Sequence, residues 1–370
     1  MESLQTILHR IEHEDRPDPA LLAQLLRIEN REELDLIYAR AYDVKRREVS
    51  ALAYFRGLIE VSNVCAKDCL YCGIRRSGNV SRYTMSNDEV IACARFAYDN
   101  GYGSIVLQSG ERRDPAFVEL IEDMVREIND MTGDSLGITL SAGEQDSSTY
   151  RRWLEAGARR YLLRIETSNR ELYARLHPAD HDYDERLRCL RELKDIGYQV
   201  GTGVMIGLPF QTTEDLARDI LFFRDIDVDM IGMGPYLYHH DTPLGREATP
   251  SIDAGGGLLD MSLMMIALSR IILKDVNIAS TTALQALHSQ GRELGLRAGA
   301  NVVMPNLTPV RYRRDYLLYD SKPCVDEDAG KSRDCLARRI GAIGEKIGWN
   351  VAGDPLHALR RMNGLTPLRN

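Results

Sequence analysis

Three cysteines lie close together in one stretch of the chain, residues 63–73. Cys65, Cys69 and Cys72 form a C-x3-C-x2-C array, and an aromatic residue, Tyr71, stands just before the third cysteine. Three thiolates on a short loop can bind three irons of a [4Fe–4S] cube and leave the fourth iron open to another ligand. The array therefore predicts a cluster with one iron available for chemistry.

Other uses of the three thiols are weaker alternatives. Soft thiolates suit zinc as well as iron–sulfur clusters, so the ligand type alone does not decide between them. A structural zinc site normally has four ligands, and no nearby Cys or His offers a fourth. Disulfide pairing leaves one of the three thiols over, and such thiols stay reduced in a cytosol. Three unligated thiols are the remaining alternative, but buried free cysteines seldom fall within eight positions of one another.

The overall composition is that of an ordinary folded chain. The protein has 370 residues and a net charge of −8, which argues against a general nucleic-acid surface. No run of eighteen apolar residues is present, and the N-terminus lacks a secretory signal pattern. We expect a cytoplasmic protein that binds neither nucleic acid nor membrane.

Short apolar runs alternate with amphipathic helical patterns from residue 51 to about residue 310. Eight of these runs read as strands that are buried on both faces, as in a parallel sheet: Ala53–Ser62, Tyr102–Ser109, Leu136–Ser141, Arg160–Glu166, Val200–Leu208, Met230–Tyr236, Val276–Thr281 and Asn301–Met304. The helical patterns between them cover residues 87–98, 115–131, 147–156, 183–196, 213–225, 258–273 and 291–298. Eight such units predict an α/β fold, a complete (β/α)8 barrel of the TIM type.

Two flanking segments complete the expected organisation. Residues 1–50 repeat leucine and isoleucine at helical spacing and predict an N-terminal helical extension. Residues 311–370 are expected to form a capping segment with a helix over Asp334–Ile347. A glycine-rich stretch at 254–257 lacks the spacing of a phosphate-binding loop, so we expect a connecting loop there.

Polar residues follow most of the predicted strands. Because the C-terminal ends of the strands of such a barrel meet at one mouth, we expect these residues to converge there. They include the cysteine loop, Gln108–Glu111, Ser141–Glu144, Arg164–Thr167, Met205–Pro209, Gly234–Tyr236, His239–Asp241, Thr281–Thr282 and Pro305–Asn306. Each of the Ser, Thr, Asp and Asn residues, taken singly, also fits a helix cap or a turn. For Asp241 and Asn306 that alternative is as good as a functional role.

The cysteine loop resembles the signature of the radical S-adenosylmethionine (SAM) enzymes. The resemblance implies a [4Fe–4S] cluster whose open iron chelates the amino and carboxylate groups of SAM, and reductive cleavage of SAM to a 5'-deoxyadenosyl radical. It also implies that the three cysteines are the metal ligands and the centre of catalysis.

SAM offers an amino group, a carboxylate and ribose hydroxyls for recognition. Glu111, beside Ser109, is placed to accept from the amino group, and Glu166 to accept from the ribose. Arg186 and Arg164 are candidates for the carboxylate, because a guanidinium matches a carboxylate in a planar fork. A structural ion pair is the alternative for Arg164 and Glu166, since side chains two apart on a strand share a face.

Further residues complete the expected site. Tyr71, Ser141 and Met205 are added to the cofactor-binding set. The substrate cavity is expected below SAM and is assigned to Thr281, Thr282, Met304, Tyr316 and Tyr319. For Met304 and the two tyrosines, ordinary core packing is an equally good interpretation.

Over nearly its whole length the chain resembles the HydE maturases of [FeFe]-hydrogenase. The similar stretches are residues 62–76, Ile105–Glu111, Tyr161–Thr167, Met205–Pro209, Gly234–Tyr236, Asp241–Leu244, Thr281–Ala283 and Gly299–Asn306. The resemblance implies a role in building the di-iron subcluster of the hydrogenase, with the radical acting on the sulfur of a cysteine-bearing organoiron precursor. It implies as partners an electron donor such as flavodoxin or ferredoxin and other hydrogenase maturases.

The chain departs from that family at two places. Many members carry a second cysteine triplet near the C-terminus, whereas here only Cys324 and Cys335 are present, so we predict no second cluster. Ile165 stands where the family often has His. The main alternative activity is that of 3-methylornithine synthase, which rearranges lysine, and a biotin-synthase-like sulfur insertion is a weaker one. A non-catalytic iron–sulfur or zinc scaffold is the alternative from another class, and it leaves the polar strand ends unexplained.

Overall fold

Eight parallel strands form a closed barrel in the computed structural model, which describes residues 2–247 and 257–364. The strands are β1 (Leu52–Ser62), β2 (Ser104–Ser109), β3 (Gly137–Ser141), β4 (Arg160–Leu162), β5 (Gln199–Thr202), β7 (Met230–Ile231), β9 (Asn277–Ser280) and β10 (Val302–Val303). They are ordered around the barrel as they follow in the chain, and β10 closes it by pairing with β1 at Tyr54–Val302. The predicted TIM-type fold is confirmed.

Three predicted strands are shorter than expected or broken in two. The run after β5 resumes as β6 (Met205–Ile206), and the run after β7 resumes as β8 (Gly234–Pro235), which pair with each other. The two backbones come together at Gly203, where a Cβ atom would lie only 2.0 Å from the carbonyl oxygen of Gly232. The predicted fourth strand ends at Leu162, and Glu166, which was expected within it, takes a positive φ of 67°.

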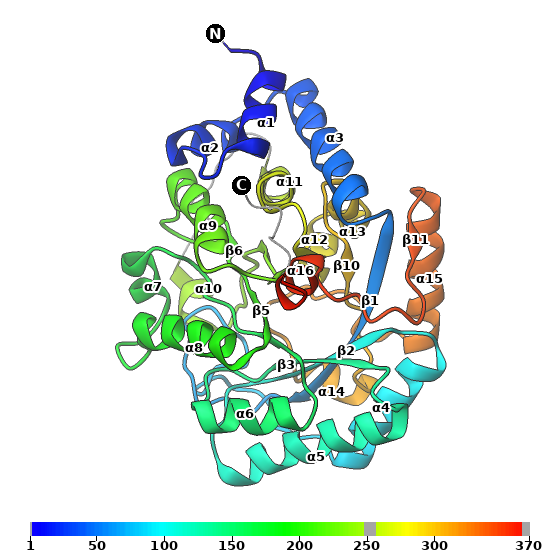
Figure 1. The fold of residues 1–370 in the computed structure, drawn as a ribbon. Helices are drawn as coiled ribbons and strands as arrows, with labels where there is room; N and C mark the ends of the chain where they lie inside the picture. The colour runs from blue at the N-terminus through cyan, green and yellow to red at the C-terminus, as the bar shows by residue number, and fades with distance from the viewer. Residues whose placement is uncertain (1, 248–256, 365–370) are drawn as a thin grey trace.

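Helices cover the outside of the barrel, as Figure 1 shows. They are α4 (Asn87–Asp99), α5 (Pro115–Thr132), α6 (Ser147–Glu155), α7 (Arg170–Leu176), α8 (Tyr183–Ile196), α9 (Thr213–Asp225), α10 (Pro243–Glu247), α11 (Gly257–Leu273), α12 (Thr282–Leu287), α13 (Gly291–Arg297) and α14 (Val310–Arg313). All seven expected helices are present within a residue or two. The short helices α7, α10, α12 and α14 were not predicted. Residues 254–256 of the expected glycine-rich loop lie outside the described residues.

The N-terminal extension consists of α1 (Leu4–His13), α2 (Pro19–Leu26) and α3 (Arg31–Glu48). The side chain of Asp18 caps α2 by accepting from the Ala20 N–H at 2.9 Å, and Pro19 occupies the first helical position. The extension packs against α9 and α11 through a buried apolar face. In Figure 1 these three helices lie together at one side of the barrel.

The C-terminal segment differs from its prediction. The helix α15 spans Ala329–Ala342 and ends before Gly344, whose φ is +83°. Lys346 and Ile347, expected in the helix, form strand β11 and extend the sheet beside the first residues of β1. A last helix, α16 (Leu356–Met362), follows. The helix therefore begins before the predicted Asp334, and the predicted C-terminal end at Ile347 was wrong.

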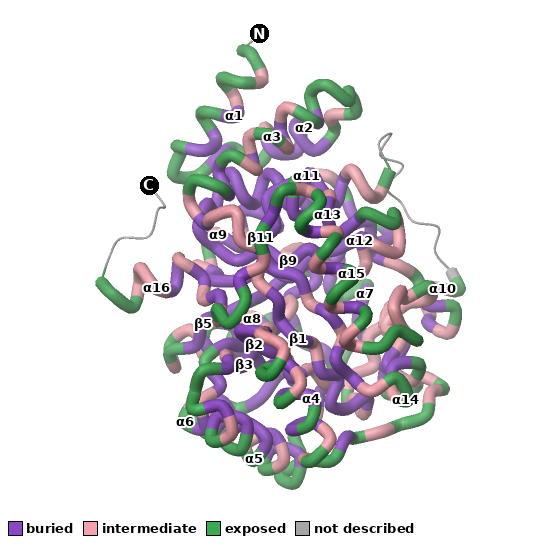
Figure 2. Tube along the Cα trace, turned by 90° about the vertical axis from the view of Figure 1, so that its right-hand side faces the viewer, coloured by how far each residue is buried: buried purple, intermediate pink, exposed green. Residues whose placement is uncertain are grey.

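Residues between β11 and α16 close the N-terminal end of the barrel. The Gly353 carbonyl accepts from Arg56 Nη2 at 2.9 Å and from Asn277 Nδ2 at 2.8 Å, and Asp354 pairs with Arg160 Nη2 at 2.5 Å. Figure 2 shows the strands inside as mostly buried. The barrel is thus sealed at the bottom, and its strand ends are left to form a site at the other end. Within the described ranges, no helix combines the length and apolar character that crossing a membrane requires.

Candidate active site

The three cysteines lie in the loop that directly follows β1, and all three are half-buried free thiols. Burial raises the pKa of Cys69 to about 12 and that of Cys72 still further, with the neighbouring thiols adding to the effect at Cys72. Such thiols become thiolates only when a cationic partner compensates their charge. The three thiols also lie close enough for their charges to act on one another, so a metal centre bound by all three would compensate them together.

Arg82, which follows the cysteine loop in the chain, holds the loop in place. Its Nη1 donates to the carbonyls of Asn63 at 2.7 Å and Ile74 at 2.8 Å, and its Nη2 donates to those of Arg75 at 2.5 Å and Gly78 at 3.1 Å. The Asn63 side chain adds a bond to the Ser81 carbonyl at 2.7 Å. A loop without regular structure needs partners for its carbonyls, and this guanidinium supplies several at once.

Tyr71 and Met205 lie on one apolar wall beside the cysteines. Both belong to a small cluster with Leu70, Leu172, Leu176, Leu208, Tyr236 and Leu244. The Tyr71 hydroxyl lies 3.2 Å from His177 Nε2, and His177 Nδ1 lies 2.8 Å from the Tyr173 carbonyl. Burial lowers the pKa of His177 to about 3, so the ring is neutral, donates through Nδ1 and accepts from Tyr71. The ring thereby fixes the orientation of Tyr71.

Glu111 is in direct contact with the cysteine loop. Its N–H donates to Cys65 Sγ at 3.3 Å, and its carbonyl accepts from the Ala66 N–H at 2.8 Å. The side chain passes over Gly143, whose φ is +73° and whose added Cβ would lie 2.4 Å from Glu111 Cγ. Burial, together with the charge of Glu144, raises the pKa of Glu111. A buried carboxylate on a residue that contacts the cysteine loop is suited to accept from an amino group.

Glu144 is a buried acid that was expected at a strand end but was given no role. It ends the loop after β3, and its side chain receives Arg186 Nε at 2.6 Å and Lys67 Nζ at 2.8 Å. Burial works to raise the pKa of Glu144, but the charges and hydrogen bonds of Arg186 and Lys67 outweigh it and lower the pKa well below the usual range. Its place at a strand end, next to the expected Ser141, was the available signal.

Arg186 therefore already has partners in this structure. Besides Glu144, it donates through Nη1 to the Arg164 carbonyl at 2.7 Å, and its Nη2 lies 3.9 Å from Glu111 Oε2. The guanidinium lies at the mouth as expected. Its positive charge balances two buried carboxylates, those of Glu111 and Glu144.

Arg164 and Glu166 form the ion pair that was the structural alternative for them. Arg164 Nη2 lies 3.0 Å from Glu166 Oε2 and also donates to the Val204 carbonyl at 2.9 Å. Burial raises the pKa of Glu166, and Arg164 opposes that effect. Ser109 donates to the Gly110 carbonyl at 2.7 Å, while Ser141 ends β3 beside Gln108. Arg164, Glu166, Ser109 and Ser141 all lie at the expected end of the barrel.

The residues expected around the substrate do not all lie at one depth. Thr281 Oγ1 is buried and has no hydrogen-bond partner among the described residues, and Thr282 Oγ1 accepts from Arg292 Nη2 at 3.2 Å. Tyr319 lies close enough for the charge of Arg292 to offset part of the rise that burial causes in the tyrosine pKa. Met304 lies deeper and lines a cavity of about 30 Å³ inside the barrel. That volume holds about one water molecule, so Met304 is chiefly a packing residue here.

A second group of charges was missed because its members are far apart in sequence. Glu60, at the end of β1, receives Lys322 Nζ at 2.5 Å and Asn306 Nδ2 at 3.1 Å. Lys322 also donates to the Tyr316 carbonyl at 3.0 Å and lies over the Tyr316 ring. The segment after α14 thus reaches the barrel mouth, where it carries Tyr316 and Tyr319.

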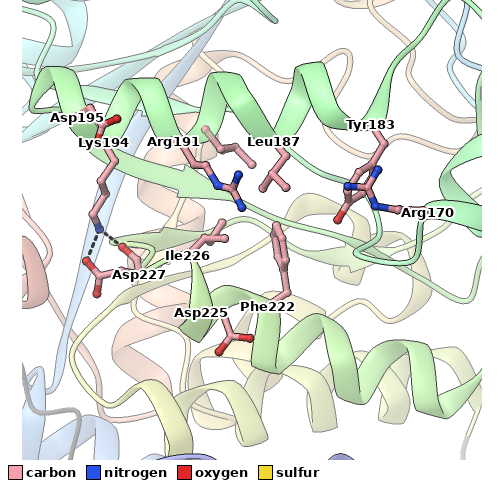
Figure 3. A pocket seen from close by; sticks show the side chains of 11 residues that line it. Arg170, Tyr183, Leu187, Arg191, Lys194, Asp195, Phe222, Asp225, Ile226 and Asp227 are labelled. Atoms are coloured by element: carbon pink, nitrogen blue, oxygen red, sulfur yellow. Dashed lines mark hydrogen bonds and ion pairs between the residues drawn. The ribbon is translucent and has the colours of Figure 1, made fainter.

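Two remaining features lie apart from the mouth residues. Cys324 is half-buried near Gln285, and Cys335 is exposed on α15, so these two thiols do not join the cysteine loop. A groove of about 510 Å³ runs between α8 and α9 on the outside of the barrel, as Figure 3 shows. It contains none of the expected site residues, and Lys194 there is paired with Asp227 at 2.5 Å.

A closed parallel barrel with a three-thiol loop at its mouth, flanked by buried acids and guanidinium groups, fits a radical SAM enzyme. The family model described as the Radical SAM superfamily matches residues 59–223. The chain is 43% identical over 335 residues to the [FeFe] hydrogenase maturase subunit HydE of Thermotoga maritima, covering 90% of this chain and 92% of that protein. The chain belongs to the radical SAM superfamily and, within it, to the HydE family.

More distant relatives share the same fold. A 3-methylornithine synthase of Methanosarcina acetivorans is 27% identical over 284 residues, covering 76% of this chain and 77% of that protein. The crystal structure of methylornithine synthase (PylB) superposes with a TM-score of 0.78 at 23% identity, covering 94% of this chain and 98% of that one. At that identity the superposition establishes the barrel. The cofactors of the superfamily, a [4Fe–4S] cluster and SAM, are those that the three thiols and the polar mouth fit.

Proposed function

We propose that this protein acts in assembly of the [FeFe]-hydrogenase active site, and that its substrate is a cysteine-bearing organoiron precursor. The observation that carries the proposal is the 43% identity to a HydE maturase, which extends over 92% of that protein. When bound, the cluster and SAM together supply a 5'-deoxyadenosyl radical. In the proposal, this radical acts on the sulfur of the precursor's cysteine.

The residues around the cysteines have separate tasks in this proposal. Cys65, Cys69 and Cys72 bind the cluster. Glu111 accepts from the amino group of SAM, because its carboxylate is buried and its backbone N–H binds Cys65. Arg164 and Glu166 take the carboxylate and the ribose, respectively, and Tyr71 and Met205 exclude water on the apolar side. Ser109 and Ser141 line the strand ends between them.

The buried hydroxyl of Thr281 favours a polar substrate on the far side of the mouth. Its hydroxyl is buried without a protein partner among the described residues, which costs about 1–3 kcal/mol unless another polar atom takes the place. A bound substrate recovers that free energy by hydrogen-bonding to it. Arg292, Thr282 and Lys322 provide cationic and polar groups for the carboxylate of an amino acid.

The test is a product analysis without oxygen, with SAM, a reductant and either the organoiron precursor or lysine. The proposal predicts an adenosyl group joined to the sulfur of the precursor. Methylornithine formed from lysine, with free 5'-deoxyadenosine and no adduct, would replace it with the mutase reaction. The variant Thr281→Val, which keeps the shape and removes the hydroxyl, should raise KM for the precursor while SAM cleavage without substrate stays unchanged.

A reductive reaction also requires a source of electrons. We include as partners a flavodoxin or ferredoxin as electron donor and other hydrogenase maturases, which the HydE relationship suggests.

A further inference from the structure

Asp219 is a fully buried acid on α9, in the helix layer around the barrel. Its Oδ1 accepts from the Ser168 N–H at 2.6 Å, whereas its Oδ2 is buried and has no hydrogen-bond partner among the described residues. A carboxyl group is costly to bury, and the buried positions of such a helix usually carry apolar side chains. The hydrogen bond from Ser168 is therefore the contact through which Asp219 can act.

Ser168 lies in the short turn that connects the fourth strand run to α7. The turn follows Glu166 directly, and Asn169 ends it by capping α7 with its side-chain oxygen. The Ser168 carbonyl accepts from the Tyr183 hydroxyl of α8 at 3.1 Å, and the Ser168 N–H is held by Asp219 of α9. Both backbone polar groups of Ser168 are thus bonded to side chains of neighbouring helices, which fix the turn from outside the barrel.

Glu166 needs such support because its backbone has an uncommon conformation. Its φ of 67° lies in the left-handed region, which residues other than glycine seldom adopt unless the surrounding structure imposes it. On the strand side, the Glu166 N–H donates to the Gly203 carbonyl at 3.0 Å, and the Glu166 carbonyl accepts from the Met205 N–H at 3.0 Å. On the helix side, the bond between Ser168 and Asp219 holds the chain. Asp219 therefore supports the side of Glu166 that the strand bonds leave free.

The turn also determines what the mouth of the barrel presents on this side. The Glu166 carboxylate, which lies 3.0 Å from Arg164 Nη2, comes immediately before the turn. Helix α7, which begins immediately after it, carries Leu172 and Leu176 of the apolar wall beside Tyr71. A change in the backbone of the turn would therefore shift the Glu166 carboxylate relative to that wall.

We propose that Asp219 is a positioning residue for SAM binding. By accepting from the Ser168 N–H, it keeps Glu166 in the left-handed conformation that offers the Glu166 carboxylate to the SAM ribose. Asp219 itself lies behind the turn and acts through Glu166. The inference rests on the assignment of Glu166 to the ribose under the proposed function, and it does not depend on the organoiron substrate.

Three substitutions at Asp219 separate its hydrogen bond from its packing. Burial raises the pKa of Asp219 to about 7, so near neutral pH the carboxyl group is protonated in part of the molecules and accepts without a full charge. Asp219→Asn keeps an acceptor oxygen and is the conservative variant. Asp219→Ala removes the acceptor, and Asp219→Leu removes it while filling the space, so that the test does not depend on one variant that folds poorly.

The test measures SAM binding and the Ser168 amide separately. Calorimetry without oxygen, on protein reconstituted with its cluster, gives the Kd of SAM for each Asp219 variant, for Glu166→Gln and for the double variant Asp219→Ala/Glu166→Gln. Hydrogen exchange of the apoprotein reports on the Ser168 amide, and urea unfolding gives the stability of each variant. The matched control is Asn129→Ala, because Asn129 on α5 is also buried and bonds to one backbone group, the Ala156 carbonyl at 2.9 Å, at the end of α6.

Asp219→Ala and Asp219→Leu should each weaken SAM binding about tenfold or more and speed exchange of the Ser168 amide, because both remove its acceptor. Asp219→Asn should bind SAM within about threefold of the wild type. Asn129→Ala should lose stability in urea and keep the wild-type Kd. Since Asp219 acts through Glu166, the double variant should bind SAM no more than about twofold more weakly than Glu166→Gln alone.

Three results would overturn the proposal: an unchanged Kd in Asp219→Ala and Asp219→Leu, an equal loss of SAM binding in Asn129→Ala, or additive losses in the double variant. An unchanged Kd in Glu166→Gln would overturn it together with the assignment of Glu166 to the ribose. Failure of the organoiron reaction alone would leave every one of these SAM Kd values unaffected, so the two proposals fail separately.

Discussion

Replacing Arg186 with glutamine should destabilise the protein even when neither cluster nor SAM is bound. In the folded protein the guanidinium, with a side chain 10% exposed, lies 2.6 Å from Glu144, whose side chain is 1% exposed. It also lies within reach of Glu111 and donates to the Arg164 carbonyl. Arg186→Gln would leave two buried carboxylates with Lys67 and the half-exposed Arg113 as their nearby cations.

The size of the effect follows from the burial of these groups. Removing one partner of a buried ion pair typically costs about 3–5 kcal/mol, since it leaves an uncompensated buried charge. Urea unfolding of the apoprotein at pH 7, followed by circular dichroism, measures the loss. The matched control is Arg188→Gln on the same helix, where the side chain is 45% exposed and pairs with Glu185 and Glu192 on the surface. It should cost less than about 1 kcal/mol.

The same variant should change how stability depends on pH. The pKa of Glu144 is depressed in the folded protein, so its contribution is fully present above the unfolded pKa of about 4.3 and is lost as the pH falls below it. Without Arg186 that depression becomes smaller, because only Lys67 remains of the two groups that cause it, and the difference between wild type and variant should narrow as the pH is lowered from 5 toward 3. If Arg186→Gln and Arg188→Gln lowered the free energy of unfolding equally at pH 7, the ion-pair reasoning would be refuted. If Arg186→Gln then weakened only SAM binding, the result would favour Arg186 as a ligand of the SAM carboxylate.

Further predictions concern the thiols and one buried lysine. Cys69→Ala should abolish both the reducible cluster and SAM cleavage, whereas Cys189→Ala, a packed thiol in α8, should retain them; the measurements are iron content and 5'-deoxyadenosine yield. Cys324→Ala should leave iron content and activity intact, and a loss of about four irons per chain would reveal a second cluster. Burial lowers the pKa of Lys45 to about 8 although Glu345 lies 2.8 Å away. Stability should therefore rise between about pH 8 and 10.5 through this group, and urea unfolding of Lys45→Met should show a smaller rise.

The barrel could be predicted from the sequence because its signals are local. Seven of the eight apolar runs are followed by a helical pattern, and parallel strands buried on both faces need no partner information to be recognised. The breaks at Gly203 and Gly232 were not predictable, since they depend on the close approach of two strand ends. The short strand β11 at Lys346–Ile347 was missed for a similar reason: it exists only because β1 offers an edge there.

The site residues at the strand ends could be predicted from the sequence. The contacts between residues of distant segments could not. Cys65, Glu111 and Tyr71 lie together because one loop and one neighbouring strand carry them. The pairing of Glu60 with Lys322 joins residues 262 positions apart, and no sequence pattern in either segment predicts it. Arg186 was expected at the mouth for its charge, but its pairing with Glu144 was not predicted.

The central claim is that this chain binds one cluster in the three-cysteine loop and uses it to cleave SAM. It is tested most directly by anaerobic reconstitution, followed by measurement of iron per chain and of 5'-deoxyadenosine formed from SAM, with and without reductant. The account predicts about four irons per chain and SAM cleavage only when reductant is present. A full complement of iron with no SAM cleavage under reducing conditions would contradict it and would favour a binding scaffold built on the same barrel.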